Sequence, residues 1–205
     1  ALVGNKGGAG KTTLCVNLAE AFAGRQPTLI LDADPQQSSL QWREIALQDK
    51  AVDVIEADDD TALWHKQFDT ASTLCLIDCP PSVHSEQMQQ ALRIADLALV
   101  PVQPSPVDIW ATVHVENEVE QALQYNPRLK SLLVINQLEP RTRLSKMMGR
   151  ALAELSLPVA DTPIRRRVVY RSSFLDGRTV HEIGRKGEAA SAEINQLMNE
   201  IRAIL

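Results

Sequence analysis

The 205-residue sequence contains no long apolar run, and neither a signal peptide nor a transmembrane segment is recognisable in it. Cysteine is scarce: Cys15, Cys75 and Cys79 are odd in number and show no zinc-site spacing. These absences argue against a membrane protein, a disulfide framework and a structural zinc centre. We therefore expect a cytoplasmic protein with reduced, buried thiols.

Internal repeats, low-complexity tracts and interdomain linkers are also missing from the sequence. With 44% hydrophobic residues, the chain is suited to a single domain, residues 1–205, with a substantial core. The chain starts almost inside its first apolar segment, so we expect a few native residues before Ala1.

Short apolar runs alternate with helical patterns along the chain. This alternation predicts an α/β fold with a doubly wound, mostly parallel sheet and helices on both faces. In such folds, nucleotides bind at the carboxyl ends of the strands. The predicted strands are Thr28–Leu31, Val52–Ile55, Leu74–Ile77, Leu97–Val102 and Leu132–Ile135, and the predicted helices are Thr12–Ala23, Ser38–Leu47, Thr61–Thr70, Ser85–Ala95, Val107–Tyr125, Leu144–Leu155 and Glu188–Leu205.

The segment Gly4–Thr13, GNKGGAGKTT, has the composition of a phosphate-binding loop. Asn5 replaces the first glycine of the standard G-x-x-x-x-G-K-[ST] pattern, and the segment fits the deviant Walker A variant instead. Lys11 is expected to contact the β- and γ-phosphates of a nucleotide, and the Thr12 hydroxyl to ligate Mg²⁺. The loop backbone is expected to cradle the phosphates, through Gly7, Gly8, Ala9, Gly10, Lys11, Thr12 and Thr13.

Lys6 is a second lysine in this loop, five residues before Lys11. A long cationic side chain at the start of the loop is expected to point away from the phosphates that its own loop binds. Lys6 is therefore free to serve a different nucleotide.

Carboxylates follow two of the predicted strands. Asp32 and Asp34 lie on the same side of an extended segment, and Asp78 ends an apolar strand in a Walker B pattern that can hold Mg²⁺ through water. Phosphoryl transfer to water needs positioned phosphates, a metal and an oriented water molecule. We expect Asp34 to orient or deprotonate that water and Asp32 to tune the Mg²⁺ shell, although the two roles can be exchanged.

Charge is distributed unevenly over the chain, whose formal net charge is −5. Residues 1–127 carry 7 basic and 18 acidic side chains, whereas residues 128–186 carry 13 basic and 5 acidic ones. A concentrated basic region suits sequence-independent binding to duplex DNA, and a solvated face with internal ion pairs is the alternative. The candidate DNA contacts are Arg165, Arg166, Arg167 and Arg171, with Arg141 and Arg143 as secondary candidates.

Together, these motifs resemble the ParA/MinD superfamily of deviant Walker ATPases. The resemblance rests on Lys6–Thr13, Asp32–Gln36 (DADPQ), Asp78–Pro81 (DCPP) and Pro101–Pro106 (PVQPSP), and it continues through Ser173–Gly177 to Gly187–Ala190. It extends over nearly the whole chain and is greatest to the small ParA-type partition ATPases, including those like ParF.

The resemblance implies a slow, partner-stimulated ATPase that segregates DNA. ATP and Mg²⁺ would promote a sandwich homodimer in which Lys6 crosses to the partner's phosphates. The dimer would bind nonspecific double-stranded DNA, and a centromere-binding adaptor of the ParB or ParG kind would trigger hydrolysis. It also implies nucleoid association, base recognition by Asn136, and contact of Pro104 and Asp108 with the adenine or the dimer interface; for Asn136, a simple turn role is an equal alternative.

Four other functions remain open within or near this superfamily. A metabolic ATP-dependent carboxyl-activating enzyme needs a small-substrate pocket, for which the sequence shows no polar cluster. An iron–sulfur electron-transfer protein needs bridging cysteines in loops, whereas Cys75 and Cys79 flank a strand. A MinD-like membrane anchor is disfavoured because the polar side of the last helix is acidic, so its apolar stripe, including Ile194 and Leu197, is expected to pack on the core. A conjugation accessory ATPase shares the loop and the DNA affinity.

Overall fold

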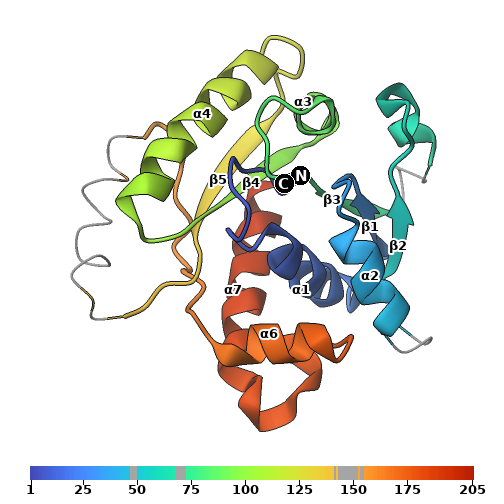
Figure 1. Ribbon diagram of the computed structural model, residues 1–205, viewed down its shortest axis with the longest axis vertical. Helices are drawn as coiled ribbons and strands as arrows, with labels where there is room; N and C mark the ends of the chain where they lie inside the picture. The colour runs from blue at the N-terminus through green and yellow to red at the C-terminus, as the bar shows by residue number, and fades with distance from the viewer. Residues whose placement is uncertain (47–49, 68–72, 141, 143–151, 153–154) are drawn as a thin grey trace.

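The computed structural model describes residues 1–46, 50–67, 73–140, 142, 152 and 155–205. Within these ranges the chain forms parallel β-strands and helices in alternation, as predicted (Figure 1). The strands are β1 (Thr28–Asp32), β2 (Asp53–Glu56), β3 (Leu74–Asp78), β4 (Leu97–Val102) and β5 (Lys130–Ile135). The α-helices are α1 (Lys11–Ala23), α2 (Ser38–Ile45), α3 (Glu86–Ile94), α4 (Pro106–Ala122), α6 (Val168–Leu175) and α7 (Glu188–Ile204), and short 3₁₀ segments are η1 (Thr61–Lys66), η2 (Val180–Glu182) and η3 (Gly184–Lys186).

The N-terminal residues join two groups of parallel strands, β2-β1-β3 and β4-β5. Leu2 forms parallel bridges with Asp78 of β3 and Leu99 of β4. The Leu2 amide donates to the Ile77 carbonyl at 2.8 Å, and the Val3 amide donates to the Leu99 carbonyl at 3.0 Å. The phosphate-binding loop therefore leaves the middle of the sheet at its carboxyl edge.

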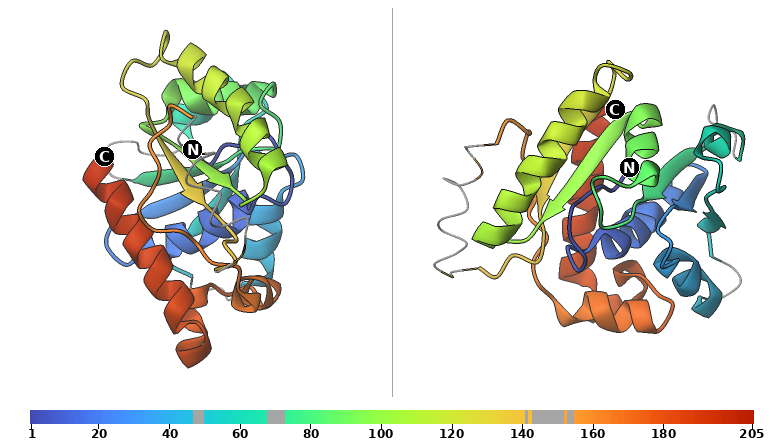
Figure 2. Two further views of the ribbon diagram at one scale, coloured as in Figure 1. Left: turned by 90° about the vertical axis from the view of Figure 1, so that its left-hand side faces the viewer. Right: turned by 45° about the horizontal axis from the view of Figure 1, so that its top comes forward.

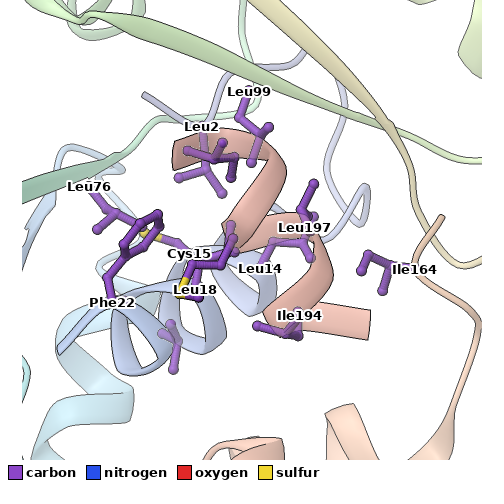
Figure 3. Close-up of a cluster of buried hydrophobic side chains, with 14 of the residues drawn as sticks. Leu2, Leu14, Cys15, Leu18, Phe22, Leu76, Leu99, Ile164, Ile194 and Leu197 are labelled. Carbon is purple, nitrogen blue, oxygen red and sulfur yellow. The ribbon is translucent and has the colours of Figure 1, made fainter. Parts of the chain in front are cut away.

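Helices cover both faces of the sheet (Figure 2). Alternate strand residues point into two cores. Ile30 packs in the core beneath α1 and α7, whereas its neighbour Leu31 packs in the core beneath α3 and α4. This period of two is the pleat of a strand that is buried on both sides. Figure 3 shows the first of these cores, where Leu14, Leu18 and Phe22 of α1 meet α7.

The last helix packs on the domain, as its apolar stripe predicts. Ile194, Leu197, Met198 and Ile201 of α7 are buried, and Ile194 and Leu197 lie beside the α1 side chains in Figure 3. Leu205 belongs to the same predicted stripe but lies at the end of the chain and is 52% exposed. Across the described residues, no helix has the length and apolar character needed to cross a membrane.

The predicted strand and helix positions hold, with local differences. β2 begins one residue later than predicted, and β5 begins two residues earlier. The predicted helix Thr61–Thr70 is wrong in type where it is described, because Thr61–Lys66 is a 3₁₀ segment. α6 was not predicted, because its sequence VVYRSSFL has a weak helical pattern. Most of the predicted helix Leu144–Leu155 lies outside the described residues.

The three cysteines are free thiols, as expected. Cys15 and Cys79 are buried, and Cys75 is half-buried on β3. Burial raises the pKa of Cys75 and of Cys79 to about 12. Both thiols are therefore neutral and unreactive at physiological pH.

Truncation of the α7 stripe should measure how much this helix stabilises the fold. Leu197 is fully buried, so Leu197→Ala is expected to lower the free energy of unfolding by about 2–5 kcal/mol, through lost apolar burial and a residual cavity. Leu205→Ala is the matched control and should change it by less than about 0.5 kcal/mol. Urea denaturation followed by circular dichroism measures both, and equal effects would mean that α7 does not dock as described.

Candidate nucleotide-binding site

The loop between Val3 and α1 depends on glycine at Gly10. Gly10 is the N-cap of α1 and has a φ of 90°, in the left-handed region that favours glycine. A Cβ at this position would also lie 2.3 Å from Nδ2 of Asn136, which is too close for any side chain. The loop backbone therefore passes directly against the end of β5 before it enters the helix.

Side-chain amides from two strand ends hold the carbonyl groups of the loop. Gln103 and Gln137 donate to the Gly8 carbonyl at 2.7 and 2.8 Å, and Asn136 donates to the Ala9 carbonyl at 2.7 Å. In a trans peptide the N–H points opposite to the C=O. Fixing these carbonyls therefore turns the amides of Ala9 and Gly10 away from the three side chains, where they can bind an anion.

A hollow of about 270 Å³ lies at the N-terminus of α1. The helix N-terminus and the loop amides favour a bound anion there. Lys11 is 6% exposed, and burial lowers its pKa, with Asp78 acting in the opposite direction. Its Nζ donates to the Lys6 carbonyl at 3.2 Å. The hollow is lined by Gly7, Gly8, Gly10, Lys11, Thr12, Thr13, Asp34, Gln36, Ser38, Pro81 and Gln137.

The carboxylates of Asp32 and Asp78 lie side by side because β1 and β3 pair in register at these two residues. Asp32 is 2% exposed and accepts the Ser39 and Leu40 amides of α2, each at 3.0 Å, and the Asp34 amide at 3.2 Å. Asp32 therefore fixes the N-terminus of α2 and has its oxygens occupied by backbone donors.

Asp78 is fully buried and has one oxygen available. Its Oδ2 accepts the Ser39 hydroxyl at 2.8 Å, whereas its Oδ1 has no hydrogen-bond partner among the described residues. Burial raises the pKa of Asp78 to about 7, and the Thr12 and Ser39 hydroxyls act in the opposite direction. A buried carboxylate oxygen without a donor, close to a threonine at a phosphate-binding loop, fits a hydrated divalent cation.

A cation at this position would draw most of its ligands from outside the protein. The described residues contain no group of three or more His, Cys, Asp or Glu side chains arranged to hold a metal ion. The site therefore fits Mg²⁺, which keeps several waters and binds through phosphates and few protein oxygens.

Asp34 differs from Asp32 in its surroundings. It is half-buried, lines the hollow, and accepts only the Gln36 amide at its Oδ1, at 3.0 Å, among the described hydrogen bonds. It can therefore accept a hydrogen bond from a water molecule in the hollow, which Asp32 is poorly placed to do. The prediction left the roles of these two aspartates exchangeable, and the geometry favours Asp34 for contact with water.

Lys6 extends away from the hollow, as expected. Its Nζ lies 2.8 Å from Oδ1 of Asp108 in the first turn of α4, and Lys6 is not among the residues that line the hollow. Asp108 is thus a partner of Lys6, and neither Asp108 nor Pro104 lines the hollow or the pocket beside it. The geometry does not support the predicted contact of these two residues with the adenine, and the other predicted contact, with the dimer interface, stays a prediction.

A second pocket of about 100 Å³ adjoins the hollow and shares Gly10, Thr13 and Gln137 with it. Asn136, the predicted base reader, lies on this pocket, but its Nδ2 binds the loop and its Oδ1 accepts the Gln137 amide at 2.9 Å. Its main observed contacts therefore position the loop. The other lining residues are Leu14, Ile164, Arg165, Arg166, Arg167, Tyr170 and Arg171.

Comparison with known proteins identifies the family. The model of the CobQ/CobB/MinD/ParA nucleotide binding domain matches residues 1–180. Maintenance of carboxysome distribution protein A from Halothiobacillus neapolitanus is 36% identical over 96% of this chain and 92% of its own. Protein ParA from Rhizobium radiobacter is 26% identical over 92% of this chain and 87% of its own.

The chain belongs to the CobQ/CobB/MinD/ParA family. Its fold is also that of solved structures: McdA from Cyanothece in complex with ATP has a TM-score of 0.74 and 17% identity, over 100% of this chain and 95% of that one. A plasmid partition protein from Borrelia burgdorferi has a TM-score of 0.70 and 15% identity, over 100% and 97% of the two chains. The deviant Walker motif and this membership make the chain a P-loop ATPase of the ParA/MinD type.

Three of the four predicted DNA-binding arginines that the structure describes are engaged within this ParA/MinD-type domain. Arg167 binds Glu193 at 2.6 Å, and Arg166 binds Glu139 at 2.6 Å. Arg165 lies 3.6 Å from Glu193, whereas Arg171 is exposed and shows no such pairing to a described residue. Internal ion pairs, the alternative to DNA contact, are therefore present for the triple arginine. Arg141 and Arg143 lie outside the described residues.

Several residues of the site were missed at the sequence level. Ser39 links Asp78 to α2, Gln103 and Gln137 hold the loop, and Ile164 and Tyr170 line the second pocket. Gln103 lies within the quoted PVQPSP segment, which signalled the region but not the role. The sequence carries no comparable signal for Ile164 and Tyr170, because only the tertiary fold brings them to the loop.

The raised pKa of Asp78 predicts a pH effect on the metal-free protein. Between the ordinary value near 4 and the folded value of about 7, the folded state binds more protons than the unfolded state, so stability falls as pH rises through this range. Asp78→Asn removes the titration. We expect the wild type to lose stability relative to this variant between pH 5 and 8, by about 1–4 kcal/mol.

Guanidinium denaturation of both proteins in EDTA, at several pH values, measures this difference. A constant difference across the range would show that Asp78 is not a buried carboxyl with a raised pKa. Asp53→Asn, on an exposed side chain, is the control for a general effect of removing one carboxylate.

Proposed function

We propose that the chain is a nucleotide-driven positioning switch. With ATP and Mg²⁺ it forms a homodimer that binds duplex DNA without sequence preference, and hydrolysis stimulated by an adaptor protein returns it to a monomer that releases DNA. The observation that carries the proposal is the placement of Lys6, which starts in the phosphate-binding loop yet lies outside its own hollow.

The hollow accommodates a triphosphate and the adjoining pocket a nucleoside. The phosphates bind the amides of Ala9 to Thr13, with Lys11 at the β- and γ-phosphates. The second pocket meets the hollow at Gly10 and Thr13 and offers the buried side chains of Ile164 and Tyr170 to a base. This assignment replaces Pro104 and Asp108 as base contacts.

The positions of several side chains in the hollow suit the hydrolysis of a bound triphosphate. Mg²⁺, when bound, neutralises charge on the phosphates. Thr12 and Asp78 would hold it, directly or through water, and the unpartnered Oδ1 of Asp78 is the observation that fits this role. Asp34 accepts a hydrogen bond from the attacking water, and Asp32 holds Asp34 and α2 in place through their amides. Lys11 places a positive charge where negative charge develops.

Dimerisation links the nucleotide site to the binding of the protein on DNA. A lysine that reaches the partner's γ-phosphate makes the dimer depend on ATP, because ADP has no such group. Two copies also double the basic surface, and phosphate contacts add in duplex binding. Arg171 is the strongest single candidate for DNA contact, because it is exposed and shows no ion pair to a described residue.

Two cargoes are supported by different observations. The DADPQ, DCPP and PVQPSP motifs resemble those of partition ATPases that move plasmids or chromosomes. The 36% identity to a carboxysome distribution protein over 96% of this chain favours a protein microcompartment. Deletion of the gene separates them: plasmid loss supports partition, and clustered carboxysomes with normal plasmid inheritance support the second function.

Lys6→Ala tests the switch itself. The variant should still bind ATP, because its own phosphates contact Lys11, but it should lose ATP-dependent dimerisation and stimulated hydrolysis. Sedimentation velocity with Mg²⁺ and ATP measures the first loss, and phosphate release measures the second. Asp34→Ala is the companion variant and should accumulate the ATP dimer, with turnover reduced about 100-fold or more. Dimers of Lys6→Ala as stable as those of the wild type would overturn the proposed role of Lys6.

The salt dependence of DNA binding tests the basic surface. The slope of log K against log salt concentration is negative, and removing one phosphate contact makes it shallower by about 0.9. Arg171→Ala should change the slope by this amount for each subunit of the dimer. Arg25→Ala, an exposed arginine just after the other end of α1, should leave it unchanged. Fluorescence anisotropy with duplexes of unrelated sequence measures both, and an unaltered slope for Arg171→Ala excludes it from the interface.

A further inference from the structure

Ser39, the second residue of α2, is fully buried where this helix meets β1 and β3. A serine at the start of a helix ordinarily caps it, by accepting the first free amides of the helix. Here the Asp32 carboxylate performs this task, because it accepts the Ser39 and Leu40 amides at 3.0 Å each. The hydroxyl of Ser39 is therefore free to bind a different partner.

That partner is the buried carboxylate of Asp78. The Ser39 hydroxyl donates to Oδ2 of Asp78 at 2.8 Å, and both residues are completely removed from solvent. A hydrogen bond to a carboxylate is directional and stronger than one between two neutral groups. The bond thus restricts rotation of the carboxylate and leaves Oδ1, which has no partner among the described residues, as the oxygen available to a ligand.

Ser39 lies behind this carboxylate and outside the hollow. Its neighbour Ser38 is among the residues that line the hollow at the N-terminus of α1, and Ser39 is not. A serine hydroxyl has one proton to donate, and in Ser39 this proton goes to Asp78. Any effect of this hydroxyl on a cation in the hollow is therefore exerted through Asp78.

We infer that Ser39 is a positioning residue for the divalent cation, and that its hydroxyl holds Asp78 in the orientation that presents Oδ1 to hydrated Mg²⁺. The inference rests on the proposed function, in which Asp78 holds this ion. Groups that orient a metal-binding side chain without touching the metal commonly change metal affinity by about 10–100-fold when they are removed.

The backbone of Ser39 makes the hydroxyl separable from the rest of the site. Its amide is held by Asp32, which fixes the end of the turn that carries Asp34. Ser39→Ala keeps this amide and removes only the link to Asp78. The variant should therefore retain the start of α2 and the position of Asp34 while it frees the Asp78 carboxylate to rotate.

A purely structural role is the alternative explanation. A buried carboxylate needs hydrogen-bond donors, so loss of the hydroxyl would lower the stability of the metal-free protein under either explanation. Only the positioning role predicts weaker metal binding without weaker binding of nucleotide in the absence of metal. These two affinities are therefore the measurements that decide.

Binding of Mn²⁺ to the equimolar complex with ADP tests the inference. Mn²⁺ accepts the same oxygen ligands as Mg²⁺, and electron paramagnetic resonance reports the concentration of the free ion. Ser39→Ala should weaken Mn²⁺ binding about 10–100-fold. Its affinity for ADP in EDTA should stay within about twofold of the wild type, because the loop amides and Lys11 are unchanged.

Two further substitutions of Ser39 guard against a folding defect. Ser39→Thr retains a hydroxyl and should restore most of the Mn²⁺ affinity. Ser39→Cys nearly preserves the volume but offers only a weak donor, so it should give an intermediate loss. In steady-state assays of Ser39→Ala, the Mg²⁺ concentration for half-maximal turnover should rise by the same factor as the Mn²⁺ dissociation constant, while kcat at saturating Mg²⁺ stays close to the wild-type value.

Ser173→Ala is the matched control. Ser173 of α6 is also fully buried, and its hydroxyl donates to the Tyr170 carbonyl at 3.3 Å, away from Asp78. This variant loses a buried hydroxyl of the same kind and should bind Mn²⁺ like the wild type. A loss equal to that of Ser39→Ala would mean that general destabilisation, and not orientation of Asp78, weakens the metal.

Asp78→Asn separates this inference from the function on which it rests. If Asp78→Asn weakens Mn²⁺ binding but Ser39→Ala does not, Ser39 has a structural role only, and the proposed cation site stands. If Asp78→Asn leaves Mn²⁺ binding unchanged, both are overturned. Adding Ser39→Ala to Asp78→Asn should cause no further loss, and fully additive losses would show that Ser39 does not act through Asp78.

Discussion

The parallel pairing of Leu2 with both Asp78 and Leu99 is the constraint on which the site depends. It places the N-terminal segment between β3 and β4, so the loop that follows leaves the sheet next to the end of β3. The register of β1 with β3 then brings Asp32 level with Asp78. A shift of one residue in either ladder would turn these side chains to the other face of the sheet. The positions of the loop, the Asp78 carboxylate and α2 thus follow from backbone hydrogen bonds far more than from contacts among the side chains of the site.

Polar and charged side chains hold the backbone of the loop and the start of α2 in place. Both carboxylate oxygens of Asp32 accept backbone amides, so they are poorly available to water. Two of these amides belong to the first turn of α2, whose position Asp32 therefore fixes. The three amides of Gln103, Asn136 and Gln137 likewise fix the carbonyls of the loop. A site of this kind needs little rearrangement when a phosphate binds, because its donors already point in one direction.

The fold and the loop could be predicted from the sequence because their signals are local. Alternating apolar runs locate the strands, and GGAGKTT identifies the loop without reference to the rest of the chain. The second pocket could not be predicted, because Ile164 and Tyr170 reach Gly10 only through the path of the chain after β5. The triple arginine shows a different limit: a run of charge in the sequence does not reveal that Glu139 and Glu193 will bind it. α6 was missed since VVYRSSFL lacks a clear helical period, and its position is set by packing.

The buried charges bear on the proposal that one loop both binds nucleotide and controls assembly. Lys11 and Asp78 are each removed from water, and burial shifts the pKa of each towards its neutral form. A triphosphate with its cation supplies the opposite charge to both, so binding is favoured by relief of two desolvated groups as well as by the loop amides. Lys6, by contrast, is 36% exposed, is already paired with Asp108 and does not line its own hollow. In the proposed dimer, the phosphates that the partner presents compete with Asp108 for this lysine. Under this proposal, the same loop serves nucleotide binding, which belongs to one chain, and assembly, which needs two.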